Sequence, residues 1–496
     1  MKNAVVIGAG FSGLASALLL SQSGLDVTLI ERSDQVAPLL RNYPSQGFDI
    51  NNGFHYLGGY YPGGALHQSF DRLGLSGRLQ PVSIDEAGFD CFRGLGGEDV
   101  LVPVGLDRVR AVLDKAFPHN ERALADYFNL MKGVFQEFSF FNLEEYFFKI
   151  EPALINTSPY AFLKERKADE ALIEFLDAYS QMLLGTTVRE VPLITHLLGI
   201  GAYFCSAHTF KGGGGALAQA LEDRVRQSGV RILTGSEVVQ VESGSRRHFS
   251  GLRLKSGRDG AESSLSADAC VCTIHPKRLV GLLPKESAFN LYSNRVSAYG
   301  DTQAICLLHL AIDREIAQDY VHNFHVFRKN GPGTIRHQIS LLPDLGASLD
   351  PSAPEQKATA LLTAWDNVPS KGCPQRASAG CSDSPGVPAG RDLSAEPEYF
   401  KPLRNRAVAR LEENFPELKG RYRIIDAVSP CHLERLNATW NGSIYGLKCT
   451  INRIGLTTIG PLKGLFLAGQ SVVAPGIFGT LVSAYLASQR IIRRNN

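Results

Sequence analysis

The sequence predicts an α/β fold with a dinucleotide-binding domain and a second domain interleaved with it along the chain. Three observations lead to this prediction. A unit of strand, glycine turn, helix, strand and acid opens the chain, a strand, glycine corner and helix close it, and a mostly helical stretch lies between them. With 496 residues, the chain is too long for one ordinary core, so we expect two or three lobes.

Composition argues against several classes of function. A net charge of +2, with 20% charged residues, gives no field that would attract nucleic acid, so we expect no nucleic-acid partner. The nine cysteines form no CxxC pair and no His/Cys cluster at zinc spacing, so we expect reduced thiols and no metal site. No window of about 18 apolar residues and no signal peptide is found. These features predict a cytoplasmic protein, either soluble or peripherally associated with a membrane.

The start of the chain contains a complete βαβ pattern. The apolar run NAVVI at 3–7 predicts a strand, and the glycine turn GAGFSG at 8–13 follows directly. A segment of helical periodicity, LASALLLSQSG, ends at Gly24, and a second strand, DVTLIE, ends at Glu31. A GxGxxG motif alone is weak evidence, but the whole unit is the Rossmann dinucleotide-binding pattern.

The residues of this unit have separate physical roles. Gly8 permits the tight turn, Gly10 lets a pyrophosphate approach the backbone, and Gly13 lets the helix pack on the strand. The helix N-terminus offers free N–H groups and a partial positive charge to the phosphates. Glu31 is expected to accept hydrogen bonds from ribose hydroxyls. Because no second GxGxxG unit follows, one dinucleotide serves the whole chain, which favours a tightly held flavin over NAD.

The stretch QGFDINNGFHYLGGYYPGG at 46–64 places one histidine among aromatic residues and six glycines. We expect the bare backbone to permit close approach to a planar ligand. His55 is then a hydrogen-bond donor to the ligand, a proton carrier near neutral pH, or a residue that shapes the turn. His55 and the adjacent Tyr56 are the candidate catalytic residues.

The middle of the chain contains three distinctive segments. Residues 105–200 are predicted to be mostly helical, and their aromatic-rich part at 126–150 forms either a subdomain core or a lipophilic substrate tunnel or membrane-facing lid. The glycines of TFKGGGG at 209–215 cannot form a P-loop, since no GK[ST] follows, so we expect them to press backbone against a flat group. Residues 368–398, rich in Pro, Gly, Ser and Ala, predict a mobile surface loop.

The end of the chain predicts a return to the first domain. LFLAG at 465–469 predicts a strand that rejoins the nucleotide-binding sheet, and a helix is expected from about Thr480. Arg490, Arg493 and Arg494 suit the negative C-terminal end of this helix. The preceding PGIFGT would place the positive helix N-terminus near a bound ring system, where it would stabilise an anionic reduced flavin.

These motifs together resemble the flavin-dependent phytoene desaturase superfamily, within it the branch of carotenoid isomerases and retinol saturases. The resemblance covers most of the chain through ordered landmarks: VVIGAGFSGLASALLL, FDINNGFHYLGG, KGGGGALAQAL, GVRILTGSEVVQV, NGSIYGLK and GLFLAGQSVVAPGIFGTLVSAYLAS. The FDINNGFHYLGG segment and the AGQ ending narrow the choice among two-dinucleotide-fold flavoproteins. The resemblance implies a Rossmann-type FAD-binding domain with an interleaved mixed-sheet and helical substrate domain.

The resemblance also implies positions for the cofactor and for the domains. The implied FAD-binding residues are Gly8, Gly10, Phe11, Ser12, Gly13, Glu31, Arg32, Arg41, Val238, Gly469, Gln470, Gly476 and Ile477. The implied FAD-binding domain comprises 1–75, 206–285 and 431–496, and the implied substrate domain comprises 76–205 and 286–430. One departure concerns the turn before Arg41, where Leu39 and Leu40 stand in place of a glycine pair found in many relatives.

The implied activity is that of an FAD-dependent oxidoreductase acting on C–C or C=C bonds by desaturation, saturation or isomerisation. The expected substrate is a lipophilic small molecule, free or carrier-bound, such as a conjugated polyene or an isoprenoid-like natural product. No Ser/His/Asp order and no close carboxylate pair stands out as catalytic. Two alternatives remain open: an amine-oxidase-like flavoenzyme that oxidises a C–N bond, and a prenyl-binding escort protein of the GDP-dissociation-inhibitor type. The sequence leaves the oligomeric state undetermined.

Overall fold

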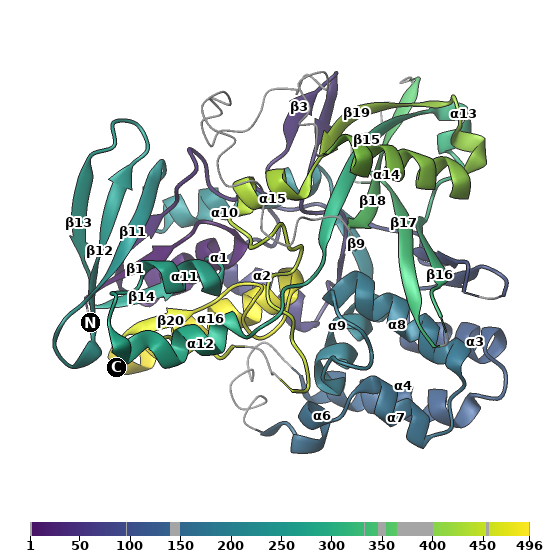
Figure 1. Ribbon diagram of the computed structural model, residues 1–496, viewed down its shortest axis with the longest axis horizontal. Coiled ribbons are helices and arrows are strands. Elements are labelled where there is room, and N and C mark those ends of the chain that lie inside the picture. Colours follow the sequence, from purple (N-terminus) through teal and green to yellow (C-terminus); the bar gives the residue numbers. More distant parts are fainter. Residues whose placement is uncertain are drawn as a thin grey trace.

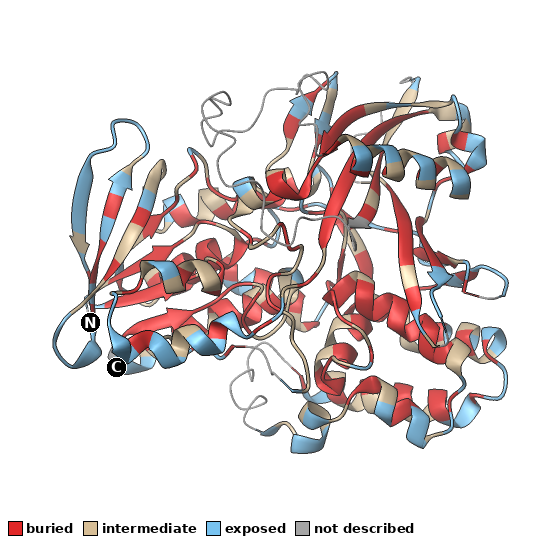
Figure 2. Ribbon diagram, viewed as in Figure 1, coloured by how far each residue is buried: buried red, intermediate tan, exposed pale blue. Residues whose placement is uncertain are grey.

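The computed structural model describes residues 2–95, 97–138, 149–331, 333–345, 354–364, 400–452 and 456–495. In Figure 1, a parallel sheet with its helices lies on the left, and a larger sheet with a layer of helices lies on the right. Both sheets draw strands from distant parts of the chain. Figure 2 shows that the central strands of both sheets are buried, which identifies two packed halves.

The parallel sheet has five short strands in the order β10-β2-β1-β14-β20. They are β1 (Asn3–Ile7), β2 (Asp26–Ile30), β10 (Arg231–Leu233), β14 (Ala269–Cys272) and β20 (Leu465–Leu467). β1, β14 and β20 are continuous apolar runs because helices and a second sheet cover both faces. Since β20 pairs with β14, the prediction that LFLAG rejoins this sheet is confirmed.

Three helices cover one side of the parallel sheet. α1 (Phe11–Ser21) is buried from Phe11 to Leu20, because it packs against the sheet, α10 (Gly213–Gln227) and α16 (Gly476–Asn495). α16 begins at Gly476, earlier than the predicted start near Thr480. A three-stranded antiparallel sheet lies beside this half in Figure 1 and comprises β11 (Ser236–Ser243), β12 (Phe249–Ser256) and β13 (Glu262–Ser266).

The larger sheet is mixed and has the strand order β19-β15-β18-β17-β16-β7-β8. β7 pairs with β16 in parallel, whereas the other neighbours pair antiparallel. Its strands are β7 (Asp90–Arg93), β8 (Val100–Val102), β15 (Ala304–Asp313), β16 (Asn323–Lys329), β17 (Ile335–Pro343), β18 (Glu355–Ala364) and β19 (Tyr422–Val428). This sheet and the parallel sheet confirm the predicted α/β fold with an interleaved mixed-sheet part.

A layer of helices packs beside the mixed sheet. These helices are α3 (Leu106–Ala116), α4 (Glu121–Glu137), α6 (Pro152–Asn156), α7 (Pro159–Glu165), α8 (Glu170–Leu184) and α9 (Leu193–Cys205). They confirm the mostly helical character predicted for the described part of residues 105–200. The remaining elements are α2 (Ala65–Leu73), α11 (Pro276–Leu282), α12 (Asn290–Ser297), α13 (Arg314–Ala317), α14 (Lys401–Asn414), α15 (Pro430–Asn437), β3 (Tyr43–Ser45), β4 (Phe48–Ile50), β5 (Leu57–Gly58), β6 (Pro81–Ser83) and β9 (Ala207–Phe210).

The aromatic-rich stretch at 126–150 is described only in part. Tyr127 and Phe128 are fully buried in the core of the helical layer, so the core interpretation holds for them. Phe138 is also buried, and its ring lies 5.4 Å from that of Phe478 at an edge-to-face angle. Residues 139–148 lie outside the described residues, and so does the segment 368–398.

The glycines of the two glycine-rich segments mostly approach protein rather than ligand. A Cβ added to Gly53 would lie 2.3 Å from the Leu39 side chain, and one added to Gly58 would lie 2.5 Å from the Tyr203 amide nitrogen. A Cβ on Gly214 would lie 2.7 Å from the Leu40 carbonyl oxygen. At these positions a protein segment, not a ligand, explains the need for glycine. The segment from Asn52 to Tyr56 nevertheless lines the main cavity, so its expected contact with a planar ligand stays a prediction.

The structure bears on the expectations about membrane helices, cysteines and metal-binding clusters. No helix among the described residues is long and apolar enough to cross a lipid bilayer. The free thiols among the described residues are Cys91, Cys205, Cys270, Cys272, Cys306 and Cys449, whereas Cys431 is disulfide-bonded. The prediction that all nine cysteines are reduced is therefore wrong at Cys431. No group of three or more His, Cys, Asp or Glu side chains among the described residues is arranged to hold a metal ion.

Candidate active site

A cavity of about 680 Å³ lies between the two halves. On one side its lining comes from the ends of β1 and β2 and from the beginnings of α1, α11 and α16. On the other side it comes from α8, β15, β16, β17 and β18. The cavity therefore begins at the carboxyl ends of parallel strands, where α/β sheets bind ligands, and extends to the mixed sheet.

The glycine turn between β1 and α1 combines a tight bend with an open surface. Gly8 has φ +92°, a conformation that favours glycine. Gly10 caps α1 and lines the cavity, and a Cβ added to it would meet no atom of the protein within 4 Å. A Cβ on Gly13 would lie 1.8 Å from the Gly8 carbonyl oxygen. Gly13 therefore serves the packing of α1 against the turn and does not line the cavity, whereas Gly10 leaves space for a ligand.

The carboxylate of Glu31 is fixed at the end of β2 and lines the cavity. One oxygen accepts a hydrogen bond from the Ala9 amide at 2.8 Å, and the other accepts from the Ser33 amide at 2.9 Å. The side chain is buried, with 8% of its surface exposed. Because each carboxylate oxygen has two lone pairs, both oxygens retain acceptor capacity for a ligand hydroxyl. The two amides hold the carboxylate ready for that role.

Of three further residues predicted to bind FAD, two lie at this end of the cavity and the third does not. Val238 on β11 and Arg32 both line it. Arg32 donates to the Arg435 carbonyl, and burial lowers the pKa of its guanidinium below the usual value. Arg41, in contrast, does not line the cavity, because it pairs with Glu222 on α10. The expectation that Arg41 contacts the cofactor is not supported by this geometry.

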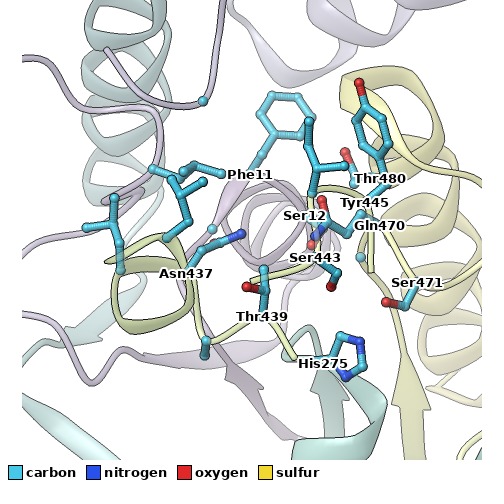
Figure 3. Close-up of a pocket in the computed structure, with 18 of the residues that line it drawn as sticks. Phe11, Ser12, His275, Asn437, Thr439, Ser443, Tyr445, Gln470, Ser471 and Thr480 are labelled. Atoms are coloured by element: carbon cyan, nitrogen blue, oxygen red, sulfur yellow. The ribbon is translucent and has the colours of Figure 1, made fainter. Parts of the chain in front are cut away.

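The corner between β20 and α16 forms another wall. Four predicted residues of this corner line the cavity: Gly469, Gln470, Gly476 and Ile477. Phe11 and Ser12 on α1 also line it. Gly469 and Gly476 have φ of +110° and +79°, and between them Val473 adopts φ +70°. A β-branched residue in this region is strained, and such strain concentrates near functional sites. Figure 3 shows Ser12 and Gln470 among the lining side chains.

Two lining hydroxyl oxygens are themselves buried and have no hydrogen-bond partner among the described residues. They are Thr439 Oγ1 and Ser443 Oγ, which belong to side chains that are 4% and 2% exposed. Figure 3 shows both residues at the cavity. Leaving a buried polar group unpaired costs about 1–3 kcal/mol, so such groups are expected to find partners on a ligand.

The two candidate catalytic residues both line the cavity. Burial lowers the pKa of His55 to about 4, so its imidazole is neutral near pH 7. This argues against a proton carrier near neutral pH and leaves hydrogen bonding or turn formation as its role. Tyr56 donates its hydroxyl proton to Asp90 at 3.2 Å, and burial, followed by the Asp90 charge, raises the pKa of Tyr56 well above its usual value.

A buried polar network behind Tyr56 was not predicted. The fully buried Asp90 carboxylate lies 3.2 Å from His325 Nε2, and His325 Nδ1 lies 2.8 Å from Ser340 Oγ. Ser340 Oγ also lies 2.8 Å from His337 Nε2, and His325, His337 and Ser340 line the cavity. Burial lowers the pKa of His337 far below its usual value, so this imidazole is neutral. The only signal in the sequence was polar residues inside the apolar strands HVFRK and RHQISLL.

A charged cluster borders the cavity at α11. Asp301 accepts a hydrogen bond from Lys277 Nζ at 2.5 Å and lies 3.4 Å from His275 Nε2. Burial lowers the pKa of His275, against the opposing effect of Asp301. The indole ring of Trp440 lies nearly parallel to His275, with ring centres 6.3 Å apart. Asp301 therefore fixes Lys277 at the wall of the cavity.

A family model described as flavin containing amine oxidoreductase matches residues 11–368. The chain belongs to this family. The all-trans-retinol 13,14-reductase of Danio rerio is 22% identical over 99% of this chain and 86% of its own length. The 4,4'-diaponeurosporene oxygenase of Staphylococcus haemolyticus is 23% identical over 90% of this chain and 87% of its own length. An oxidoreductase structure from Methanosarcina mazei matches with a TM-score of 0.67 at 18% identity, covering 99% of this chain and 100% of that one.

As a member of the flavin containing amine oxidoreductase family, this chain is an FAD-dependent oxidoreductase. The resemblance to the carotenoid and retinol branch is confirmed by these relatives. The geometry fits FAD: Gly10 leaves room beside the N-terminus of α1, and Glu31 presents a fixed acceptor. The unpaired hydroxyls of Thr439 and Ser443 add partners for a polar ligand.

Proposed function

We propose that the protein transfers electrons between FAD and a C–C or C=C bond of a lipophilic, conjugated substrate. The observation that supports this proposal is the extent of the cavity, which joins the nucleotide-binding turn to an apolar region under the mixed sheet. The apolar lining there includes Ile305, Leu342 and Leu361. The names of the two relatives, a retinol reductase and a diaponeurosporene oxygenase, fit a polyene substrate.

The residues of the chain bind and orient rather than supply a strong base. When bound, FAD accepts or donates the electron pair at carbon. In a conjugated substrate the developing charge is delocalised, so a strong general base is not required. Tyr56, Tyr203 and Tyr445 stay protonated, since burial raises the pKa of each phenol, that of Tyr445 to about 12. These phenols line the cavity and present neutral, largely apolar surfaces to the substrate.

The proposal is tested anaerobically by mixing all-trans polyenes with the purified holoenzyme, once with its flavin oxidised and yellow and once with its flavin chemically reduced. Only the reduced flavin can supply the two hydrogens of a saturation, and only the oxidised flavin can accept those of a desaturation. Flavin absorbance and product mass are followed together. A gain or loss of two hydrogens identifies saturation or desaturation, and changed geometry at constant mass identifies isomerisation. If no polyene perturbs the flavin spectrum and none is converted, the proposal is wrong.

Oxidation of an amine is the second candidate function. The description of the family itself favours it, because its model is named for amine oxidoreductases. The same anaerobic assay separates the two, since a C–N oxidation reduces the flavin with amines and not with polyene hydrocarbons or alcohols. The escort alternative is set aside because it would use no flavin, whereas this family is flavin-containing.

We further propose that this enzyme lies in the cytoplasm and collects its substrate at a membrane surface. A groove of about 240 Å³ on the nucleotide-binding half is lined by five cationic side chains and, among the described residues, by no carboxylate. Ile459 at its edge is 55% exposed. Cations around an exposed apolar residue suit anionic lipid. We expect the protein to sediment with vesicles of anionic lipid and not with vesicles of neutral lipid. Equal sedimentation with both kinds of vesicle, or sedimentation with neither, would refute this proposal.

A further inference from the structure

At the end of the cavity beneath the mixed sheet, called the inner end below, a buried carboxylate lies behind the lining residues Tyr56 and His325, and all of its partners are inside the protein. Asp90 is fully buried and accepts from Asn323 Nδ2 at 3.1 Å and from Tyr179 at 3.3 Å, in addition to Tyr56 and His325. These four donors come from β16, α8 and the segment after β4. The carboxylate therefore needs no ligand of its own, and it fixes the direction in which its neighbours donate.

Two phenol hydroxyls at this end donate their hydrogen bonds to other groups of the protein, and their oxygens can still accept hydrogen bonds. Tyr56 donates to Asp90, which is an acceptor, and Tyr445 donates to the Met182 carbonyl at 3.0 Å. The oxygens of both phenols retain acceptor capacity at the cavity lining. Tyr203, whose ring centre lies 5.1 Å from that of Tyr56, has a hydroxyl that can take either role.

Two lining glutamines present oxygens in the same way. Gln181 Nε2 donates to the Asp177 carboxylate at 2.7 Å, and Gln303 Nε2 donates to the Gln181 backbone carbonyl at 3.0 Å. Both partners only accept, so each amide orientation is fixed, and each Oε1 must face elsewhere. Both Oε1 atoms are buried and have no hydrogen-bond partner among the described residues. The lining atoms at this end that can still form hydrogen bonds are therefore mainly acceptor oxygens.

We propose that this end of the cavity is a subsite for a hydrogen-bond-donating terminal group, an O–H or N–H, on the lipophilic substrate. The inference rests on the proposed function and specifies its substrate class further. The terminal group donates to one or more of the lining oxygens of Gln181, Gln303, Tyr56 and Tyr445. An alcohol O–H supplies one such hydrogen bond, and a protonated amine supplies up to three. An apolar chain end would leave the two buried amide oxygens unpaired, so the subsite selects against hydrocarbon ends.

The electrostatics of the cluster formed by Tyr56, Asp90 and His337 argue against a role in proton transfer. Ionising Tyr56 would place a second negative charge beside Asp90, and burial together with that charge keeps the phenol protonated. His337 is kept neutral by burial. The network therefore holds its protons in fixed positions, which suits recognition of a ligand.

The test compares three ligands that share one polyene body: all-trans-retinol, the corresponding primary amine, and the corresponding hydrocarbon that ends in a methyl group. Binding to the FAD-loaded enzyme is measured anaerobically from the change in flavin absorbance. For the wild-type chain we expect the alcohol, the amine or both to bind roughly tenfold or more tightly than the hydrocarbon, as expected for one buried hydrogen bond. The preferred ligand identifies which donor the subsite takes.

Variants then locate the preference. Gln303→Leu and Gln181→Leu are expected to reduce the advantage of the polar ligand severalfold and to leave hydrocarbon affinity nearly unchanged. Gln338→Leu is the matched control, since Gln338 lies on β17 and does not line the cavity. Gln303→Glu is expected to favour the amine over the alcohol, because it adds a negative charge. FAD content and thermal melting check that each variant is folded.

Two results would overturn the subsite. One is a wild-type enzyme that binds the hydrocarbon as tightly as the alcohol and the amine, a measurement that does not depend on any variant folding. The other is undiminished preference in both leucine variants. In either case a polyene that still perturbs the flavin leaves the proposed function standing. If no member of the series perturbs it, the proposed function fails together with the subsite.

Discussion

Replacing Gly10 with alanine separates cofactor binding from folding. Gly10 has φ −70° and ψ −177°, which alanine adopts without strain, and the added Cβ meets no protein atom within 4 Å. The only space that the new methyl group occupies is cavity space next to the N-terminus of α1. Gly10→Ala should therefore fold normally and obstruct the approach of the FAD pyrophosphate.

The magnitudes follow from this geometry. The stability of the apoprotein should be nearly unchanged, because the restriction that alanine places on the unfolded chain offsets its poorer propensity for the N-cap position. A phosphate held away from the backbone loses hydrogen bonds from free helix N-terminal amides, and two such charge-assisted bonds contribute about 3 kcal/mol or more. FAD affinity should then fall by at least about 100-fold. In Gly13→Ala, the comparison variant, the Cβ would lie 1.8 Å from the Gly8 carbonyl, so several kcal/mol of folding stability should be lost.

The assay combines FAD titration by fluorescence quenching with urea unfolding of the apoprotein. Gly10→Ala is expected to match the wild-type unfolding midpoint while failing to retain FAD during purification. Gly13→Ala is expected to be unstable with or without FAD. Wild-type FAD affinity in Gly10→Ala would refute the assignment of this turn as the phosphate site, whatever the result for Gly13→Ala.

Three further predictions concern titrating or charged groups. Glu31→Gln should lower apoprotein stability by about 1–3 kcal/mol in urea unfolding and weaken FAD binding, because its amide NH2 faces a backbone donor; unchanged values would contradict this role. Burial lowers the pKa of His196 from 6.5 to about 3, so the folded state binds fewer protons there, and this histidine alone should lower stability below pH 6.5, by about 2 kcal/mol at pH 5. His196→Gln should remove this share of the pH dependence in urea unfolding at several pH values, whereas the exposed control His248→Gln should not. His55→Gln should leave the pH profile of turnover unchanged between about pH 6 and pH 8, and a shifted profile would restore the proton-carrier role.

The parts of the site that were predictable from the sequence are those encoded locally. The turn from Gly8 to Gly13 and the acid Glu31 lie within one βαβ unit, so spacing alone placed them. Arg41 was predicted to bind FAD, but it pairs with Glu222 on α10, a residue far along the chain that no local pattern could connect with it. The glycines around His55 were assigned to a ligand because sequence shows bare backbone but does not show which surface approaches it. The proposed domain boundaries likewise remain predictions.

The polar end of the cavity depends on register, which is why no local pattern revealed it. Asp90 is brought to this site by the parallel pairing of β7 with β16, in which Asn323 lies opposite Asp90. In the antiparallel pairing of β16 with β17, His325 lies opposite Ser340. A slip of one residue in either pairing would turn these side chains to the opposite face of the sheet. The same registers place apolar neighbours such as Phe324 and Ile339 in a separate core cluster. The burial of that core therefore fixes the register, and the register in turn assembles the polar network.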